Sequence, residues 1–245
     1  MIRSFLVICL TAGIISALQT NARAQMFSMD NDRSSLSRIT SEVYLGLEPT
    51  TVTYQGDESV ELPGQFNYDA PIIRVGYNGR SLNLFMGAGG EITGSDNVGY
   101  FDVGGNINYG FPLYATEEVL IQLPIQIASR YVNITNSQNV ATLDRFRFGS
   151  LTAGTGIKAM VRPTQKVRLQ AGAVPAYGFS FASGGLFGGS LGSLALNGRL
   201  YLDRLFNNNI GLSFGYMYEL RNYNVEEERY DYRIKGHSLQ LGITF

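Results

Sequence analysis

Several residue types that would decide the class of a protein are scarce or missing from this chain of 245 residues. It has one cysteine, one histidine and no tryptophan. Beyond residue 24, no apolar run approaches the ~20 residues that a membrane-spanning helix needs. Lys and Arg number 19 against 20 Asp and Glu, so no basic excess indicates a nucleic-acid partner. These absences argue against a disulfide scaffold, a helical membrane protein and a nucleic-acid-binding protein.

The first 24 residues have the pattern of a secretory signal peptide. Arg3 gives a charged start, an apolar run extends from Phe5 to Leu18, and Ala22-Arg23-Ala24 provides an A-x-A cleavage site. The lone Cys9 lies inside this segment and lacks the small-residue context of a lipoprotein cleavage site. If cleavage follows Ala24, we expect a mature chain of 221 residues (245 − 24) with no cysteine. Its 17 basic and 20 acidic residues would give a net charge of −3.

Glycine and aromatic residues, in contrast, are abundant: 29 glycines, 15 tyrosines and 14 phenylalanines. At this density, with few helix-forming runs, they indicate β-structure with many turns and close approaches. Apolar side chains recur at every second position in ten segments, the period of a β-strand with one apolar and one polar face. The predicted strands are 42–54, 67–77, 80–92, 98–110, Val119 to Arg130, 145–162, Val167 to Tyr177, Leu194 to Leu202, Ile210 to Tyr218, and a closing strand that ends at Phe245.

The closing segment carries the most specific pattern. Leu239, Leu241, Ile243 and Phe245 share one face, and polar or small residues fill the positions between them. A chain that stops on such a strand with an aromatic residue resembles the bacterial outer-membrane β-barrels, a superfamily whose assembly machinery reads this kind of ending. The resemblance covers most of the mature chain. It implies the outer membrane of a Gram-negative cell, contact with outer-membrane lipid, and recognition of these four side chains by the barrel-assembly machinery.

The connections between the segments favour a closed barrel. An even strand count brings both ends of the barrel to the same side, as single-chain bacterial barrels require. Connections after the second, sixth and eighth segments are short, whereas those after the first, fifth, seventh and ninth are longer and polar. Asn78-Gly79 is the strongest two-residue hairpin signal, while the loop at 94–97 is shorter than the alternation predicts. A soluble secreted β-protein is the weaker reading, because an apolar stripe follows every strand.

We therefore predict an all-β fold, a closed antiparallel transmembrane β-barrel of ten strands over residues 41–245. Eight strands are the alternative, if the weak segments 42–54 and 145–150 are misread. Residues 25–40 show no alternation and are rich in Ser, Asp and Arg. We expect them to form a periplasmic tail or a short plug in the lumen.

Two local features of the strands carry predictions of their own. Pro124 cannot donate a ladder hydrogen bond, so we expect a bulge or a gap beside it. Phe146 and Phe148 are out of phase with the later apolar residues of the segment 145–162, and a bulge near Gly149-Ser150 would bring both halves to the outer face. Tyrosines near strand ends are expected in the membrane-interface belts: Tyr54, Tyr68, Tyr77, Tyr109, Tyr131 and Tyr177.

The inward-facing positions of the predicted strands hold many charged side chains. Ten tilted strands leave an interior that side chains can largely fill, and unpaired charges there would be costly. The predicted polar cluster of the lumen is Arg74, Asp102, Arg130, Lys158, Arg168, Arg199, Glu219 and Arg221. Lys158, Arg162, Arg168 and Arg199 fall toward the periplasmic half, where Glu42 is the only acid clearly at their level. This imbalance supports a second reading, a narrow path that prefers anions.

The outer loops have the opposite charge. Their acidic residues are Asp57, Glu58, Glu61, Asp69, Asp96, Asp144, Glu226, Glu227, Glu228 and Asp231. A solvated rim explains them, and binding of divalent cations or of a basic partner is the more specific reading. No loop has the spacing of a defined calcium site. The sequence predicts no metal site and no cofactor.

Catalysis is not expected from this sequence. The one histidine, His237, precedes Ser238, but adjacent strand residues point to opposite faces. A nucleophile and its base must come within hydrogen-bond reach, which this register prevents. The glycine-rich stretches 87–90 and 184–189 lack the strand-to-helix context of a phosphate-binding loop. The leading hypothesis is a non-enzymatic outer-membrane barrel with a largely filled lumen, envelope-structural or surface-interacting through its acidic loops. The alternative is a narrow, anion-preferring solute channel.

Overall fold

The computed structural model describes residues 41–59, 63–137, 145–182, 188–206, 210–225 and 230–245. All of them belong to the unit Ser34–Phe245, and the other unit of the chain, Met1–Arg33, lies outside the described residues. The expected signal peptide and the tail or plug at 25–40 also lie outside them and stay predictions.

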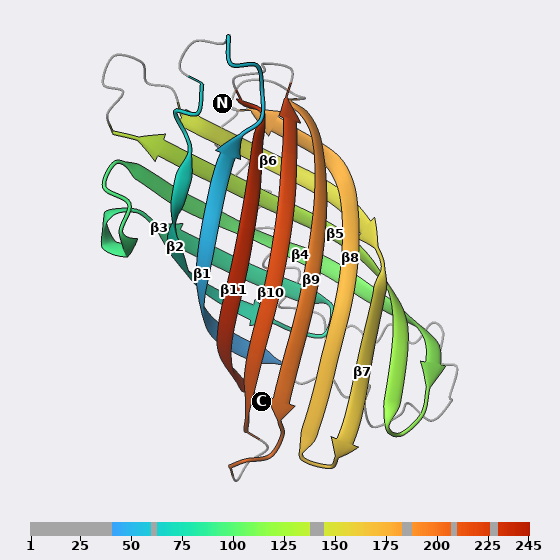
Figure 1. Cartoon of the computed structure of the whole chain (residues 1–245). Helices are drawn as coiled ribbons and strands as arrows, with labels where there is room; N and C mark the ends of the chain where they lie inside the picture. The colour runs from blue at the N-terminus through green and yellow to red at the C-terminus, as the bar shows by residue number, and fades with distance from the viewer. Residues whose placement is uncertain (1–40, 60–62, 138–144, 183–187, 207–209, 226–229) are drawn as a thin grey trace, which may run out of the picture. The chain divides into compact units, whose positions relative to one another are not determined.

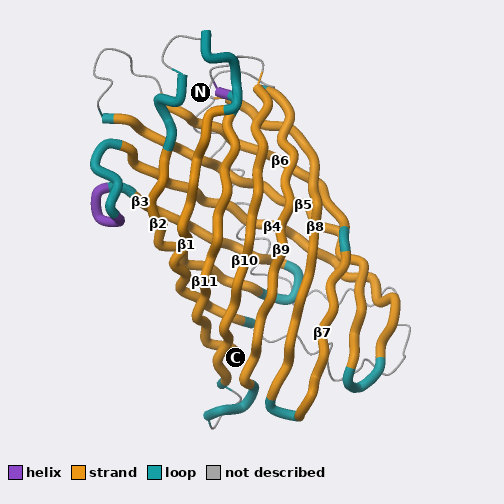
Figure 2. Tube along the Cα trace, in the orientation of Figure 1, coloured by secondary structure: helices purple, strands orange, loops and turns teal. Residues whose placement is uncertain are grey.

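The described chain is almost entirely β-structure and includes a short 3₁₀ helix at Glu91–Thr93 (Figure 2). In chain order the strands are β1 (Glu42–Tyr54), β2 (Tyr68–Asn78), β3 (Leu82–Gly89), β4 (Val98–Ala115), β5 (Val119–Asn136), β6 (Arg145–Thr155), β7 (Ile157–Thr164), β8 (Val167–Ala182), β9 (Gly189–Leu202), β10 (Gly211–Val225) and β11 (Tyr232–Thr244). Among these residues, no helix is long and apolar enough to cross a bilayer.

The sheet closes on itself into a barrel. Each strand pairs antiparallel with its neighbours, β1 pairs with β11, and β4 pairs with β5. Figure 1 shows the first and last strands, blue and dark red, side by side. β6 and β7 both lie between β5 and β8 and so occupy one position in the wall. The barrel therefore has ten strand positions, which confirms the predicted ten and rules out eight.

The register of the pairs fixes the tilt of the strands. A path from partner to partner that starts at Glu42 returns to β1 at Tyr54, 12 residues farther along. For ten strands this shift corresponds to a tilt of about 40° from the barrel axis. A barrel of this size is narrow enough for side chains to fill.

The gap predicted at Pro124 is present and divides β6 from β7. β5 pairs with β6 from Ile125 onward and with β7 only up to Gln122. Pro124 has no N–H to continue the ladder, and its carbonyl accepts instead from the Thr155 hydroxyl at 2.8 Å. Gly156, the single residue between the two strands, leaves no room for a side chain because a Cβ there would overlap the Ala173 carbonyl.

The bulge predicted near Gly149-Ser150 is wrong. The β5–β6 register runs without a shift from Thr155 to Arg145. Phe146 and Phe148 consequently face the lumen, where they are 0% and 1% exposed. The prediction assumed that apolar side chains always face lipid, but this part of the lumen is itself apolar.

The outer wall of the barrel is an apolar surface. Large apolar side chains alternate with buried ones along the strands and stand exposed, among them Val43, Leu45, Leu47, Ile73, Val75, Leu84, Met86, Ile107, Ile125, Ile127, Ile157, Leu169, Leu196, Leu239, Leu241 and Ile243. Tyr109, Tyr131 and Tyr177 are exposed on this wall, as predicted for interface residues. Tyr68 is only 2% exposed and points inward, as does Tyr54, which packs on the buried Tyr232, so that prediction is wrong for both.

The two rims differ in the length of their connections. One rim holds Ser41 and Phe245, whose backbones exchange two hydrogen bonds, and the short turns 79–81, 116–118 and 165–166. The connection 203–210 on the same rim is longer than predicted. The opposite rim holds the longer loops, the one after β3 included. By the usual rule of outer-membrane barrels, the first is the periplasmic rim and the second the outer rim.

After Ile107, β4 extends beyond Leu82, the first residue of β3. The remaining part of this edge of β4 therefore pairs with no described strand. The last bond across this pair runs from the Asn108 N–H to the Ser81 carbonyl at 2.8 Å. Pro112 follows on the open stretch, where the pairing with β5 also shifts register. A proline on an edge strand removes a donor that another chain would need for pairing.

Candidate functional site

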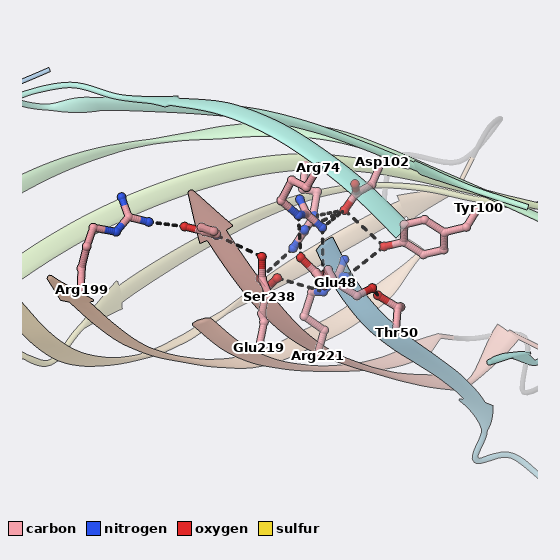
Figure 3. Close-up of polar contacts among 11 residues, drawn as sticks. Glu48, Thr50, Arg74, Tyr100, Asp102, Arg199, Glu219, Arg221 and Ser238 are labelled. Carbon is pink, nitrogen blue, oxygen red and sulfur yellow. Dashed lines mark hydrogen bonds and ion pairs between the residues drawn. The ribbon is translucent and has the colours of Figure 1, made fainter. Parts of the chain in front are cut away.

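A network of ion pairs lies across the middle of the lumen (Figure 3). Arg74 on β2 donates from Nε to Glu48 Oε2 at 2.7 Å and from Nη2 to Glu48 Oε1 at 3.1 Å. The same Nη2 donates to Asp102 Oδ2 at 3.1 Å. All three side chains are at most 1% exposed. Charges this deeply buried are tolerable only when they are paired with good geometry.

Asp102 connects this pair to the other side of the lumen. Its Oδ2 accepts from Arg130 Nε at 2.9 Å and from the Tyr100 hydroxyl at 3.2 Å. Arg130 Nη1 donates to Glu219 Oε1 at 2.7 Å. Arg221 donates from Nη2 to the Tyr100 hydroxyl at 3.0 Å, and its Nε lies 3.8 Å from Glu219 Oε2. One carboxylate oxygen is therefore the shared acceptor of side chains from β2, β4 and β5.

The network is balanced in charge. Its carboxylates are Glu48, Asp102 and Glu219, and its guanidinium groups are Arg74, Arg130 and Arg221. The Arg74 and Arg130 guanidinium carbons lie 4.7 Å and 4.4 Å from the centre of the Phe85 ring, which adds cation–π contacts. Within the described part of the chain, four buried network atoms have no hydrogen-bond partner: Arg74 Nη1, Asp102 Oδ1, and Arg221 Nε and Nη1. We call these six residues with Tyr100 the central ion network.

An aromatic layer fills the lumen between this network and the outer rim. Its buried members are Val52, Phe66, Tyr68, Ala70, Ile72, Tyr100, Val132, Ile134, Phe146, Phe148, Leu191, Tyr223, Val225, Tyr232 and Ile234. The Phe146 ring centre lies 4.6 Å from that of Phe148 and 5.4 Å from those of Tyr223 and Tyr232. Phe66 comes from the loop after β1 and is 0% exposed, and its backbone N–H donates to the Tyr232 hydroxyl oxygen at 3.2 Å. The layer closes the outer half of the lumen with apolar side chains.

Separate ion pairs occupy the periplasmic half. Arg199 on β9 donates to Glu42 and to Gln240, and the Ser213 hydroxyl also donates to Glu42. Arg168 donates from Nε and Nη2 to the two carboxylate oxygens of Asp203 at 2.5 Å and 2.7 Å. The predicted basic cluster is thus largely neutralised, and Asp203, in the turn after β9, is the acidic partner that sequence reasoning missed.

Lys158 differs from the other lumen cations. Among the described residues it makes no hydrogen bond or ion pair, and it faces Gln122 across the β5–β7 pair. Its inward neighbours in this half are amides that are only partly buried: Asn106, Asn108, Gln122, Gln126, Gln170 and Asn197. Among the described residues, the inward side chains of the periplasmic half are therefore less buried than those of the outer half.

The predicted lumen residues fall into three groups. Arg74, Asp102, Arg130, Glu219 and Arg221 meet in the central ion network, Arg199 and Arg168 form two pairs below it, and Lys158 stands apart. Glu48 and Tyr100 belong to the network but were not predicted as members, and the contact of Phe85 with two of its guanidinium groups was not predicted either. The alternation of apolar and polar residues in the segment 42–54 already puts Glu48 on the inward face. This alternation was the signal by which the sequence could have identified it.

His237 and Ser238 lie on opposite sides of the wall, as their register predicts. Ser238 is 0% exposed inside the barrel and accepts from Gln240 Nε2 at 3.1 Å. His237 is on the outer wall, where its Nδ1 shares a hydrogen bond of 2.8 Å with the Tyr216 hydroxyl. In the described ranges, no group of three or more His, Cys, Asp or Glu side chains could hold a metal ion.

Known proteins resemble this chain in fold alone. No protein-family model matches it, and no curated protein matches it. Similar solved structures include the translocator domain of the autotransporter NalP from Neisseria meningitidis, with a TM-score of 0.43, 12% identity and coverage of 84% of this chain and 88% of that one. Ail, the attachment invasion locus protein of Yersinia pestis, has a TM-score of 0.29, 14% identity and coverage of 84% and 99%. The outer-membrane protease OmpT from Escherichia coli has a TM-score of 0.34, 11% identity and coverage of 91% and 99%.

The closed sheet and the apolar outer wall decide the location. A barrel leaves no strand edge through most of its wall, and its outward side chains match hydrocarbon. The chain is a bacterial outer-membrane β-barrel.

Proposed function

We propose that this protein is a non-enzymatic outer-membrane barrel with a closed lumen, acting at the cell surface or in the structure of the envelope. The aromatic layer is the observation that carries the proposal. Its members lie on strands from all around the barrel, and seven of them are Phe or Tyr. An ion crossing the outer half would have to displace fully buried rings that pack on one another.

The central ion network supports the same function. Its guanidinium and carboxylate groups are bonded to each other across the lumen rather than lining an open path. An ion that entered would have to break these pairs and leave a charge buried without a partner, which is strongly unfavourable. Selective channels, in contrast, present weak binding positions from which an ion can leave again.

The surface that remains available for function is the outer rim. Its described acidic residues include Asp57, Glu58 and Asp96, which are exposed. The Ser59 N–H donates to Asp57 Oδ1 at 2.8 Å, and this bond holds the pKa of the Asp57 carboxyl below its ordinary value. Asp231 instead accepts from the Val225 N–H at 2.6 Å and fixes the ends of the last loop. A basic partner or a divalent cation is the chemistry that this rim fits.

A narrow anion channel is the second candidate. Lys158 favours it, because this cation stands among partly exposed amides with no described carboxylate bonded to it. Arg168 and Arg199 add little to the attraction of an anion, since each is bonded to an acid.

Catalysis by the Ser–His mechanism is not part of the proposal. The only histidine faces away from the lumen, so no imidazole reaches the buried Ser238. The orientation leaves the serine without a histidine base.

Single-channel conductance in a planar bilayer tests the proposal. The protein is refolded, and a mobility difference between unboiled and boiled samples on a gel establishes that it has folded. A folded barrel that gives no discrete conductance steps is the expected result. Anion-preferring steps that lose their preference in Lys158→Gln would overturn the closed-lumen proposal in favour of the channel.

A further inference from the structure

The lipid-facing wall carries very few charges, and they are unevenly placed. Along the described strands, the Asp, Glu, Lys, Arg and His side chains that point outward are Asp69, Arg145, Arg147, Arg233, Lys235 and His237. All six lie in the half of the wall next to the outer rim. Three of the five basic ones follow each other at alternate positions of one strand, β11, and so form a vertical row on its outer face.

Arg233 and Lys235, the two cations of this row nearest the outer rim, have no acidic partner among the described residues. Arg233 donates from Nε to Asn222 Oδ1 at 2.8 Å, and its two terminal nitrogens make no hydrogen bond with a described residue. Lys235 is exposed and makes no described hydrogen bond or ion pair. Asp69, the one acid that points outward on the described strands, is two strands away from Lys235 and accepts from the Thr51 hydroxyl at 3.4 Å.

The row has polar neighbours near the outer rim and aromatic neighbours farther from it. Arg233 is paired in register with Thr53 on β1, and Lys235 with Thr51, so two hydroxyls stand beside the two cations. Below them His237 bonds the Tyr216 hydroxyl, and the Tyr218 ring centre lies 5.0 Å from its own. Tyrosine rings are typical of the level where headgroups meet acyl chains.

We propose that Arg233 and Lys235, with the Thr53 hydroxyl, bind a phosphate group of a lipid headgroup in the outer leaflet. A positive charge on a lipid-facing wall is costly near the midplane and is tolerated near the interface. An anionic headgroup compensates the charge there. The terminal nitrogens of Arg233 fit two phosphate oxygens, and the Lys235 ammonium adds a point charge beside them. Apolar side chains lower on the wall, such as Leu239, receive the acyl chains.

The binding of labelled lipid A tests this site. The probe is lipid A that carries its phosphates, titrated against the folded full-length barrel in detergent, with dephosphorylated lipid A as the second probe. The test variant is Arg233→Gln/Lys235→Gln, whose altered side chains lie on the outer wall away from the lumen. The matched control is Arg145→Gln/Arg147→Gln, which removes two outward cations from β6 near the same rim.

We expect the test variant to bind phosphorylated lipid A about 25-fold more weakly, since each of the two cations contributes a factor of about five. The control variant should bind it like the wild type, and the dephosphorylated lipid should not distinguish the three proteins. An equal loss in the control variant would overturn the site, because it would show attraction by net charge alone. Equal wild-type affinity for both lipids, or full displacement by inorganic phosphate at millimolar concentration, would also overturn it.

Discussion

The most direct test of the lumen architecture is the replacement of Asp102 by Asn. Oδ2 of this buried carboxylate accepts from Arg74, Arg130 and Tyr100 at 3.1 Å, 2.9 Å and 3.2 Å. Asparagine keeps the shape of the side chain but removes its charge. The central ion network then contains three guanidinium groups and two carboxylates.

The expected loss of stability follows from this imbalance. Removing one partner of a buried ion pair typically costs about 3–5 kcal/mol, because the other charge remains buried without compensation. Asp102 is 0% exposed, so water cannot replace it without opening the lumen. The expected loss is a large part of the roughly 5–15 kcal/mol by which folded domains are usually stable. The matched control, Asp69→Asn, removes an exposed acid from the outer wall and should change stability by less than about 0.5 kcal/mol.

Urea unfolding in phospholipid vesicles measures the effect. The chain has no tryptophan, so circular dichroism replaces the usual fluorescence signal. The second variant is Asp102→Asn/Arg130→Met, which leaves Arg74 with Glu48 and Arg221 with Glu219. Because the charges balance again, we expect it to recover at least half of the loss. A single variant within about 1 kcal/mol of the wild type, or a double variant no more stable than the single one, would refute the argument.

Three further predictions concern the rest of the barrel. Phe146→Ala empties the centre of the aromatic layer and should cost about 3–5 kcal/mol in the same unfolding assay, and a cost below ~1 kcal/mol would contradict the packing described. Gly178→Ala should lower the refolded fraction on unboiled gels, because its Cβ would overlap the Leu151 carbonyl across the β6–β8 pair; Gly192→Ala, whose Cβ meets nothing within 4 Å, should refold normally. Phe245→Ser should reduce the amount of barrel assembled in cells while refolding in detergent is unchanged, and normal assembly in cells would show that this residue is not read.

The strands were predictable because their pattern has one physical origin. A wall between lipid and a filled lumen requires alternation at period two, and segments such as 42–54 and Leu239 to Phe245 show it clearly. β1 and the closing strand β11 were accordingly found at their predicted places. The ladder gap at Pro124 was predictable for a different reason, since proline has no N–H to donate.

The contacts between side chains inside the barrel were harder to predict from the sequence. Alternation tells which side chains face inward but not which of them meet, because partners across the lumen depend on the 12-residue shift around the barrel. Arg130 and Glu219, for example, are 89 positions apart in the chain. Phe146 and Phe148 were assigned to the wrong face, because apolar side chains at alternate positions give the same sequence pattern whether they face lipid or an apolar lumen.

The two halves of the lumen differ in burial, and this difference determines the side from which a ligand can enter. The aromatic layer excludes water from the outer half, and this exclusion keeps the buried pairs of the central ion network in a low-dielectric environment where they attract strongly. The amides around Lys158 remain partly exposed toward the periplasmic rim. A solute could therefore reach this lysine from the periplasm without passing the outer rim. On the outer rim, in contrast, the described residues exposed to molecules outside the cell include the acids Asp57, Glu58 and Asp96, whereas the row of cations on β11 faces lipid.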